Sequence, residues 1–166
     1  MNIFVLDKDV KTCARYHCDQ HVIKMILEST QILCTALNLK GFETPYKSTH
    51  IQHPCVKWAG KSYSNFKWLV KLAYALNVEY RYRFEKKTDH KSIDTIKQIR
   101  KFDFEDQGLT QFVQAMPNQY KVPGDPVQAY RNFYNYDKSR FAKWSRRAKP
   151  SWFKVKYKSK IQMVSC

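Results

Sequence analysis

Long apolar runs, glycines and acidic side chains are all scarce in this sequence of 166 residues. No apolar segment approaches the roughly 20 residues that a membrane-spanning helix needs, so we do not expect an inserted protein or a membrane partner. With 4 Gly and no low-complexity tract, the chain lacks the composition of a disordered tail. The first residues hold too short an apolar stretch before a charge to form a signal peptide. These absences predict an intracellular protein with a packed core.

Paired cysteines and glycine-rich phosphate loops are also missing. The five cysteines are an odd number without regular spacing, which indicates a reducing compartment rather than a disulfide framework. The sequence contains no Cys-x-x-Cys pair, and the His-x-Glu and Pro-Cys-x-x-Cys signature of the zinc deaminases is absent. The lack of a glycine-rich phosphate loop argues against nucleotide hydrolysis of the P-loop type.

Positive charge dominates the composition. Lys and Arg total 30 against 14 for Asp and Glu, which gives a formal net charge of +16. Such an excess repels itself in the compact state unless an anionic partner offsets it. Nucleic acid, an acidic membrane surface and an acidic protein could each be that partner. Aromatic residues make up 15% of the chain, and because such rings stack on bases beside positive charge, they favour nucleic acid.

The N-terminal quarter of the chain predicts one long helix. Apolar residues recur at three- and four-residue spacing over about residues 12–39, which describes one buried helix face. Asp7 or Asp9 can cap the start of this helix, and Gly41 is placed to stop it.

The rest of the chain also has helical periodicity. Residues 54–84 predict one short and one long helix, residues 92–102 a short basic helix, and residues 126–145 a last helix that begins with proline. No repeat, βαβ alternation or change in composition marks a second domain. We therefore predict an all-α fold: a single-domain irregular helical bundle over residues 1–166 that binds DNA, with a basic, aromatic C-terminal segment at 138–166.

Five polar residues of the first predicted helix share one stripe. They are His17, His21, Lys24, Glu28 and Gln31, at successive offsets of 4, 3, 4 and 3 residues. If the stripe lines a cleft, its two His, its Lys and its Glu could transfer protons and stabilise charge. If it faces solvent, Lys24 and Glu28 form an ion pair one helical turn apart.

A metal site is another interpretation of the same helix. His17 and His21 have the spacing to share one ion, and His50, His53 and Cys55 in the next loop could add ligands. Two features of the sequence argue against it: there is no paired Cys-x-x-Cys, and no Glu follows the first His as it does in the zinc protease helix. We therefore predict that no metal is bound.

The C-terminal segment is the most basic part of the chain. Residues 138–160 carry ten Lys or Arg and no acid, interleaved with aromatic residues. The cations can neutralise phosphates while the rings stack on exposed bases, each stack being worth about 1–3 kcal/mol. We predict DNA contacts at Arg140, Lys143, Arg146, Arg147, Lys149, Trp152, Phe153, Lys154, Lys156 and Tyr157. Alternatively the rings are pinned into the core, which applies most to Phe141 and Trp144.

Two patches of the sequence together carry a family resemblance. The first is Asp19-Gln20-His21, followed seven residues later by Glu28, and the second is Lys149-Pro150-Ser151-Trp152-Phe153-Lys154 with Tyr157. Both resemble the small bacteriophage pyrimidine-dimer DNA glycosylase/AP lyase family, often called the endonuclease V type. The resemblance implies an all-helical fold, Glu28 as the central catalytic carboxylate, and double-stranded DNA with a flipped base as partner. It also implies that no cofactor is needed, and a location in the cytoplasm of the host cell.

The resemblance further implies catalysis by the N-terminal amine. The family's nucleophile is the α-amine of a small residue exposed by removal of the initiator Met, whereas here Asn2 should hinder that removal and leave the amine on Met1. Ile3 stands where the family has a basic residue. An α-amine titrates at about 7.7–8.0, against about 10.4 for Lys, so part of it is a neutral nucleophile at physiological pH. It could attack a sugar C1′ while Glu28 stabilises the developing cation. The implied catalytic set is Met1, Asn2, His21, Lys24 and Glu28.

Our leading prediction is therefore a DNA glycosylase/AP lyase that acts on damaged or modified pyrimidines through a Schiff base. Two other functions are open to this sequence. One is a non-enzymatic DNA-binding or packaging protein, in which the polar stripe is structural and the basic C-terminal third makes all the contacts. The other is a metal-dependent nuclease.

Overall fold

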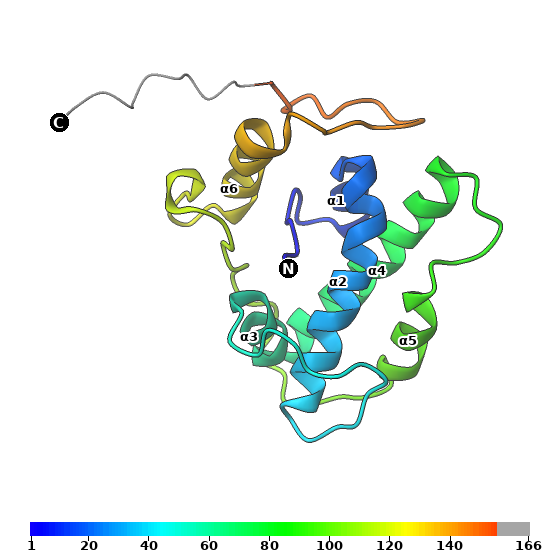
Figure 1. Ribbon diagram of the computed structural model, residues 1–166. Coiled ribbons are helices and arrows are strands. Elements are labelled where there is room, and N and C mark those ends of the chain that lie inside the picture. Colours follow the sequence, from blue (N-terminus) through cyan, green and yellow to red (C-terminus); the bar gives the residue numbers. More distant parts are fainter. Residues whose placement is uncertain (156–166) are drawn as a thin grey trace.

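The computed structural model describes residues 1–155 of the chain (Figure 1). Over this range the chain forms six α-helices, one 3₁₀ turn, one π-helical turn and no strand. The elements are α1 (Val10–Tyr16), α2 (Asp19–Asn38), α3 (Pro54–Lys61), α4 (Tyr63–Arg83), α5 (Ser92–Ile99), η1 (Asn118–Tyr120), α6 (Pro126–Phe133) and η2 (Tyr134–Lys138). The prediction of an all-α fold is therefore confirmed.

The bundle is built around α2. This helix packs against α3, α4 and α5, and α4 also packs against α1. In Figure 1, α6 stands apart from this group, and the N-terminal residues pass through the space between α6 and α2. None of the helices in residues 1–155 is long and apolar enough to cross a membrane.

The first residues of the chain form part of the core. Ile3, Val5 and Leu6 are fully buried, and Phe4 is 5% exposed. The segment is fixed from α6, where Arg131 Nε donates to the carbonyl oxygen of Leu6 at 3.0 Å. The burial of this segment fixes the start of the chain against the core, with Met1 itself partly buried.

The prediction of one helix over residues 12–39 is wrong, because the structure divides this stretch into α1 and α2. His17 and Cys18 have extended backbone between the two helices, with ψ of 134° and 162°. Asp9 caps α1 as predicted, by accepting a hydrogen bond from Thr12 N. The break takes His17 out of the polar stripe, and its Nδ1 lies 2.7 Å from the carbonyl oxygen of Cys13.

The middle helices follow the sequence pattern closely. The break predicted within residues 54–84 falls at Ser62, whose extended backbone separates α3 from α4. Pro54 occupies the first turn of α3, where its missing N–H leaves no helical hydrogen bond unmade. The predicted basic helix at 92–102 is present as α5, which ends three residues earlier.

The last predicted helix is shorter than expected. Asp125 caps α6 and Pro126 begins it, but the helix ends at Phe133 and only the π-helical turn carries it on to Lys138. Beyond that turn the backbone makes a few local turns and also bonds to the start of α2. Asp19 N donates to the carbonyl oxygen of Lys143 at 2.8 Å, and the Asp19 carboxylate accepts from Ser145 N at 2.9 Å.

Candidate active site

A cavity of about 270 Å³ lies at the N-terminus of the chain. Its walls come from residues 1–4, from α2, from residues 115–117 and from the end of α6 with the π-helical turn. All five residues of the predicted catalytic set, Met1, Asn2, His21, Lys24 and Glu28, line it. Met1 and Glu28, which lie 27 positions apart in the sequence, therefore line the same cavity.

Glu28 is the carboxylate at the centre of this cavity. It is 8% exposed and accepts a hydrogen bond from Asn2 N at 2.9 Å through Oε2. The same oxygen lies 3.7 Å from the Met1 amine, and Oε1 lies 3.4 Å from Lys24 Nζ. The predicted Lys24–Glu28 ion pair is present, but the carboxylate is buried and faces the N-terminus, so the interpretation of a solvated helix face does not hold for Glu28.

Asn2 holds the start of the chain in place. Its side chain donates from Nδ2 to the carbonyl oxygen of Ala115 at 2.7 Å. Its Oδ1 accepts from the backbone N–H groups of Ile3 and Phe4, at 2.7 and 3.2 Å. These bonds turn the chain sharply after Asn2, and Phe4 has a φ of +40°, which few residues other than glycine adopt. The turn points the amine end of the chain at Glu28.

His21 forms an uncharged wall of the cavity. Its ring stacks on Phe4 with centroids 4.3 Å apart, and its Nδ1 shares a hydrogen bond with the Tyr134 hydroxyl at 2.6 Å. Burial, followed by the nearby His17, Lys138 and Lys24, lowers the pKa of His21 far below its ordinary value. The imidazole is therefore neutral across the physiological pH range, and it offers a flat face and a hydrogen bond but no positive charge.

Two lysines supply the positive charge around this cavity. The Lys24 side chain is 67% exposed. Lys138 Nζ lies 4.5 Å from the centroid of the Phe133 ring and 2.9 Å from a carboxylate oxygen of Asp137. A ligand with phosphate groups near the cavity would meet these cations before it reached the buried Glu28.

The five residues proposed as alternative metal ligands do not form a cluster. Within residues 1–155, no group of three His, Cys, Asp or Glu side chains is arranged to hold an ion. His17 is fully buried, and burial lowers its pKa to about 4. Cys55 is also fully buried, and burial raises the pKa of its thiol to about 12, so the thiolate that a metal needs is disfavoured. His50 is exposed and His53 is partly buried at the start of α3.

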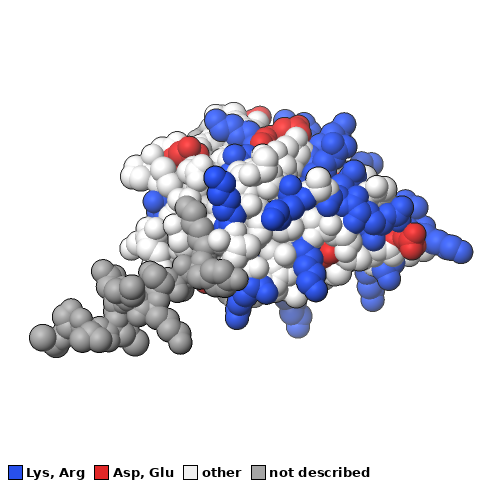
Figure 2. Space-filling view, turned by 90° about the horizontal axis from the view of Figure 1, so that it is seen from above, with Lys and Arg blue, Asp and Glu red and all other residues white. Residues whose placement is uncertain are grey.

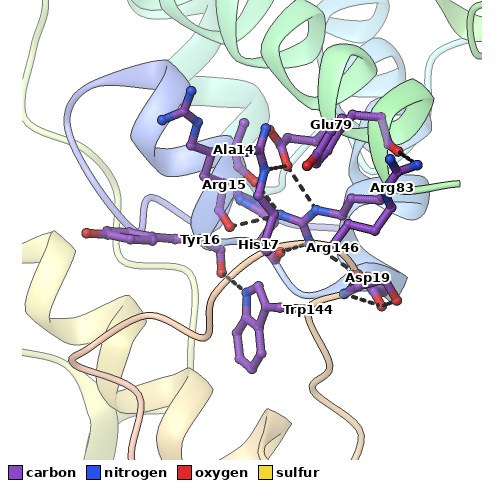
Figure 3. Close-up of polar contacts among 12 residues, drawn as sticks. Ala14, Arg15, Tyr16, His17, Asp19, Glu79, Arg83, Trp144 and Arg146 are labelled. Atoms are coloured by element: carbon purple, nitrogen blue, oxygen red, sulfur yellow. Dashed lines mark hydrogen bonds and ion pairs between the residues drawn. The ribbon is translucent and has the colours of Figure 1, made fainter. Parts of the chain in front are cut away.

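A buried ionic network joins α4 to the C-terminal segment (Figure 3). The Arg83 side chain is fully buried and donates to Glu79 Oε2 at 2.9 Å and to Asp19 Oδ1 at 3.2 Å. Arg147 donates to both carboxylate oxygens of Glu79, at 3.0 and 2.8 Å. Burial acts to raise the pKa of Glu79, but the hydrogen bonds from Arg147 and Arg83 outweigh it and hold that pKa below its usual range.

The predicted DNA contacts of the C-terminal segment differ widely in exposure. Arg140, Lys143, Arg146, Lys149 and Lys154 are exposed, whereas Arg147 is partly buried on Glu79. Arg146 also pairs with Glu85, at 3.0 Å. Lys156 and Tyr157 lie outside the described residues. Figure 2, viewed from above the bundle, shows many more Lys and Arg than Asp and Glu side chains on that face.

The aromatic residues of this segment belong mainly to the core. Phe153 is 5% exposed and packs against Trp144, with ring centroids 4.7 Å apart. Trp152 is partly buried, and Arg131 lies 5.2 Å from its ring centroid. Phe153 is therefore packed in the core of the free protein, and its DNA contact stays a prediction. The indole of Trp144 donates to the Tyr16 carbonyl oxygen at 2.9 Å, so the alternative of rings pinned into the core fits this residue.

Sequence reasoning missed several residues that shape the site. Tyr134 holds the His21 ring, Phe4 stacks on it, and Arg83 anchors the start of α2. Only the spacing of Glu79 and Arg83, one helical turn apart on α4, could have indicated the ionic network.

One comparison with known proteins gives a match. The family model for pyrimidine dimer DNA glycosylase matches residues 1–92. The matched part contains the whole predicted catalytic set and the Asp19-Gln20-His21 motif, and it confirms the resemblance found in the sequence. The second patch of that resemblance, at 149–157, lies beyond the matched residues. Comparisons with curated proteins and with solved structures give no match.

Proposed function

Because the chain belongs to the pyrimidine dimer DNA glycosylase family, we propose that it excises damaged or modified pyrimidines from DNA through a Schiff base on its N-terminal amine. The observation that carries the mechanism is the position of the Met1 amine, 3.7 Å from the buried carboxylate of Glu28 inside a cavity. A nucleophile beside an anion in an enclosed space suits a reaction that develops positive charge.

The chemistry begins with the uncharged amine. Its lone pair attacks C1′ of the damaged nucleotide, a new C1′–N bond forms, and the base leaves with the electrons of the glycosidic bond and takes up a proton. The attached nitrogen loses a proton, and its lone pair then expels the ring oxygen O4′, which takes up a proton, so the sugar ring opens and a cationic imine forms between C1′ and the nitrogen. Glu28 stabilises this cation, and loss of a proton from C2′ expels the 3′ phosphate, which is the AP lyase step.

The amine is that of Met1 in this proposal. Its side chain is 3% exposed and packs against the core, while the residue as a whole is partly buried. If Met1 were removed, the new amine would be Asn2 N, which lies 2.9 Å from Glu28 Oε2. Either amine meets the same carboxylate, and the identity of the modified residue in a trapped complex distinguishes them.

The cavity walls suit a single base turned out of the duplex. Phe4, Phe133 and the neutral imidazole of His21 line the cavity, and aromatic groups of this kind hold extrahelical bases. Lys24 and Lys138 are placed to contact the phosphates that flank such a base. The exposed cations of residues 138–154 extend the same positive surface along the duplex.

Reduction with borohydride tests the proposal directly, because it converts an imine into a stable covalent bond. Protein is incubated with borohydride and duplex DNA that contains an abasic site, and separately with duplex DNA that contains a cyclobutane pyrimidine dimer. We expect a cross-linked complex on both duplexes and none on undamaged DNA. Digestion and mass spectrometry should place the adduct on the N-terminal residue.

Protein with an acetylated N-terminal amine is the matched control, since acetylation removes the nucleophile and leaves every side chain in place. It should bind DNA without becoming cross-linked. Full cross-linking of the acetylated protein would move the nucleophile to a side chain, with Lys24 as the first candidate. DNA binding without any cross-link, even for the unmodified protein, would favour the non-enzymatic DNA-binding or packaging protein.

A further inference from the structure

The solvent-facing side of α2 carries two apolar residues beside the candidate active site. Helices α3, α4 and α5 pack against α2, and four of its twenty residues are exposed: Gln20, Ile23, Lys24 and Leu27. Ile23 is 41% exposed and Leu27 is 39% exposed. Because residues four apart on a helix are neighbours on its surface, these two aliphatic side chains form one continuous apolar ridge.

Lys24 lies between the apolar ridge and the cavity. Around the helix axis it stands about 40° from Glu28 on one side and about 60° from Leu27 on the other. Lys24 lines the cavity and its side chain is 67% exposed, so the cavity opens to solvent on this side of α2. The apolar ridge is therefore beside the mouth of the cavity, although neither Ile23 nor Leu27 lines the cavity itself.

Duplex DNA is the partner that suits this apolar ridge. Two partly exposed aliphatic side chains fall far short of the roughly 800 Å² that each partner buries in a stable protein–protein interface. A second copy of a chain with a net charge of +16 would also be repelled. The same charge attracts DNA, and proteins that kink DNA insert Leu or Ile side chains between adjacent bases.

We propose that Ile23 and Leu27 are an apolar wedge that enters the base stack of the DNA next to the extruded nucleotide. This inference rests on the proposed function. Extrusion of a nucleotide breaks its stacking and pairing, which opposes the reaction. Aliphatic side chains in the vacated space restore apolar contact to the neighbouring bases, while Lys24 can meet a flanking phosphate. The wedge thereby stabilises the extruded state from outside the cavity.

The variant Leu27→Ala shortens the wedge and keeps a residue that favours the helix. Part of the Leu27 side chain is already buried in the free protein, so only the remainder can gain contact with DNA. We expect borohydride cross-linking to dimer-containing duplex, at saturating protein, to slow about five- to tenfold. The double variant Ile23→Ala with Leu27→Ala should be slower still. Cross-linking to a single-stranded oligonucleotide with an abasic site should not change, because no base stack has to be opened.

The matched control is Leu39→Ala, the same substitution at the other end of α2. Leu39 is the C-cap residue of this helix and is 57% exposed. It lies about 18 Å beyond Leu27 along the helix axis, well away from the cavity. This variant should cross-link to both DNAs at the rate of the unchanged protein. All the variants should keep its melting temperature, because the replaced side chains are exposed.

The two DNAs distinguish failure of the wedge from failure of the proposed function. If Leu27→Ala cross-linked to the duplex as fast as the unchanged protein, the wedge would be overturned and the proposed function would stand. Equal slowing on the single strand would also overturn the wedge, since the side chain would then act on the cavity or the fold. Absence of cross-linking by the unchanged protein on either DNA would instead refute the proposed function.

The fluorescence of 2-aminopurine tests the wedge without any chemistry. This base analogue, placed beside the dimer, brightens when its stacking neighbour is displaced, and an acetylated N-terminal amine in every sample prevents base removal. Saturating protein should raise the emission, and the double alanine variant should raise it less. Leu27→Lys replaces the apolar side chain with a cation. If this variant raised the emission as much as Leu27 does, charge alone would account for the contact and the wedge would be overturned.

Discussion

Replacement of Glu28 by Gln tests the centre of the proposed mechanism. Gln keeps the shape of the side chain, and its remaining oxygen can still accept the hydrogen bond from Asn2 N. The change removes one negative charge 3.7 Å from the amine on which positive charge develops. At an effective dielectric constant of about 20, a charge pair at that distance is worth about 4 kcal/mol, or about 10³-fold in rate.

We expect Glu28→Gln to lower the single-turnover rate of base excision by about 10²- to 10³-fold, the range typical of losing one preorganised electrostatic group. DNA affinity should hardly change, because Glu28 repels phosphates rather than binding them. The pair with the exposed Lys24 contributes less than about 1 kcal/mol, so a larger fall in the free energy of unfolding would report the lost pair with the Met1 amine. Rates are measured with protein in excess over dimer-containing duplex, and unfolding with urea.

The variant Glu43→Gln makes the same chemical change at an exposed position and serves as the matched control. It should excise at the rate of the unchanged protein. If Glu28→Gln did so too, the carboxylate would be only the ion-pair partner of Lys24, and the electrostatic argument would be refuted.

Three further predictions concern binding and stability. Duplex DNA affinity should fall about 10²-fold between 50 and 200 mM salt if about four exposed cations of residues 138–154 contact phosphates, and affinity independent of salt would contradict this. Burial lowers the pKa of His17 from 6.5 to about 4, so the unfolded chain binds a proton at this residue before the folded protein does. The free energy of unfolding is therefore unaffected by His17 above pH 6.5 and decreases as the pH falls towards 4. Protonation of His21 lowers stability over the same pH range, so the part due to His17 is the difference in pH dependence between the unchanged protein and His17→Phe in urea unfolding, and it should be on the order of 3 kcal/mol. Arg83→Met leaves Glu79 with one cation instead of two and should cost about 3–5 kcal/mol of unfolding free energy. A cost below about 1 kcal/mol would show that Arg147 alone satisfies the carboxylate.

Periodicity located the helices well because each buries an apolar face against α2 or the core. It could not locate the break between α1 and α2, since apolar residues on both sides keep the helical spacing. The break depends on a distant residue: Arg83 donates to the carbonyl oxygens of Arg15 and His17, at 2.8 and 2.7 Å, and so satisfies groups that a continuous helix would have bonded itself. Such a contact leaves no trace in the local sequence.

The candidate site was accessible from the sequence because its residues form a motif on one helix and at the start of the chain. The positions of Glu28 and His21 on one face of α2 follow from helical geometry alone. The contact of Tyr134 with His21 could not be anticipated, because it depends on how the π-helical turn after α6 packs against α2. The burial of Phe153 could not be anticipated for a related reason, since a basic neighbourhood predicts exposure unless the packing partner, here Trp144, is known.

The enclosed N-terminus restricts how the protein can be produced and fused. Residues added ahead of Met1 would convert its amine into a peptide group and would have to occupy the cavity beside Glu28. Under the proposed mechanism, an affinity tag at that end would turn the nucleophilic amine into a peptide group, and a cleavage that leaves one extra residue would move the amine away from Glu28. Recombinant protein intended for activity assays should carry its tag at the opposite end, and an N-terminal fusion offers a ready-made inactive form for crystallising the complex with DNA.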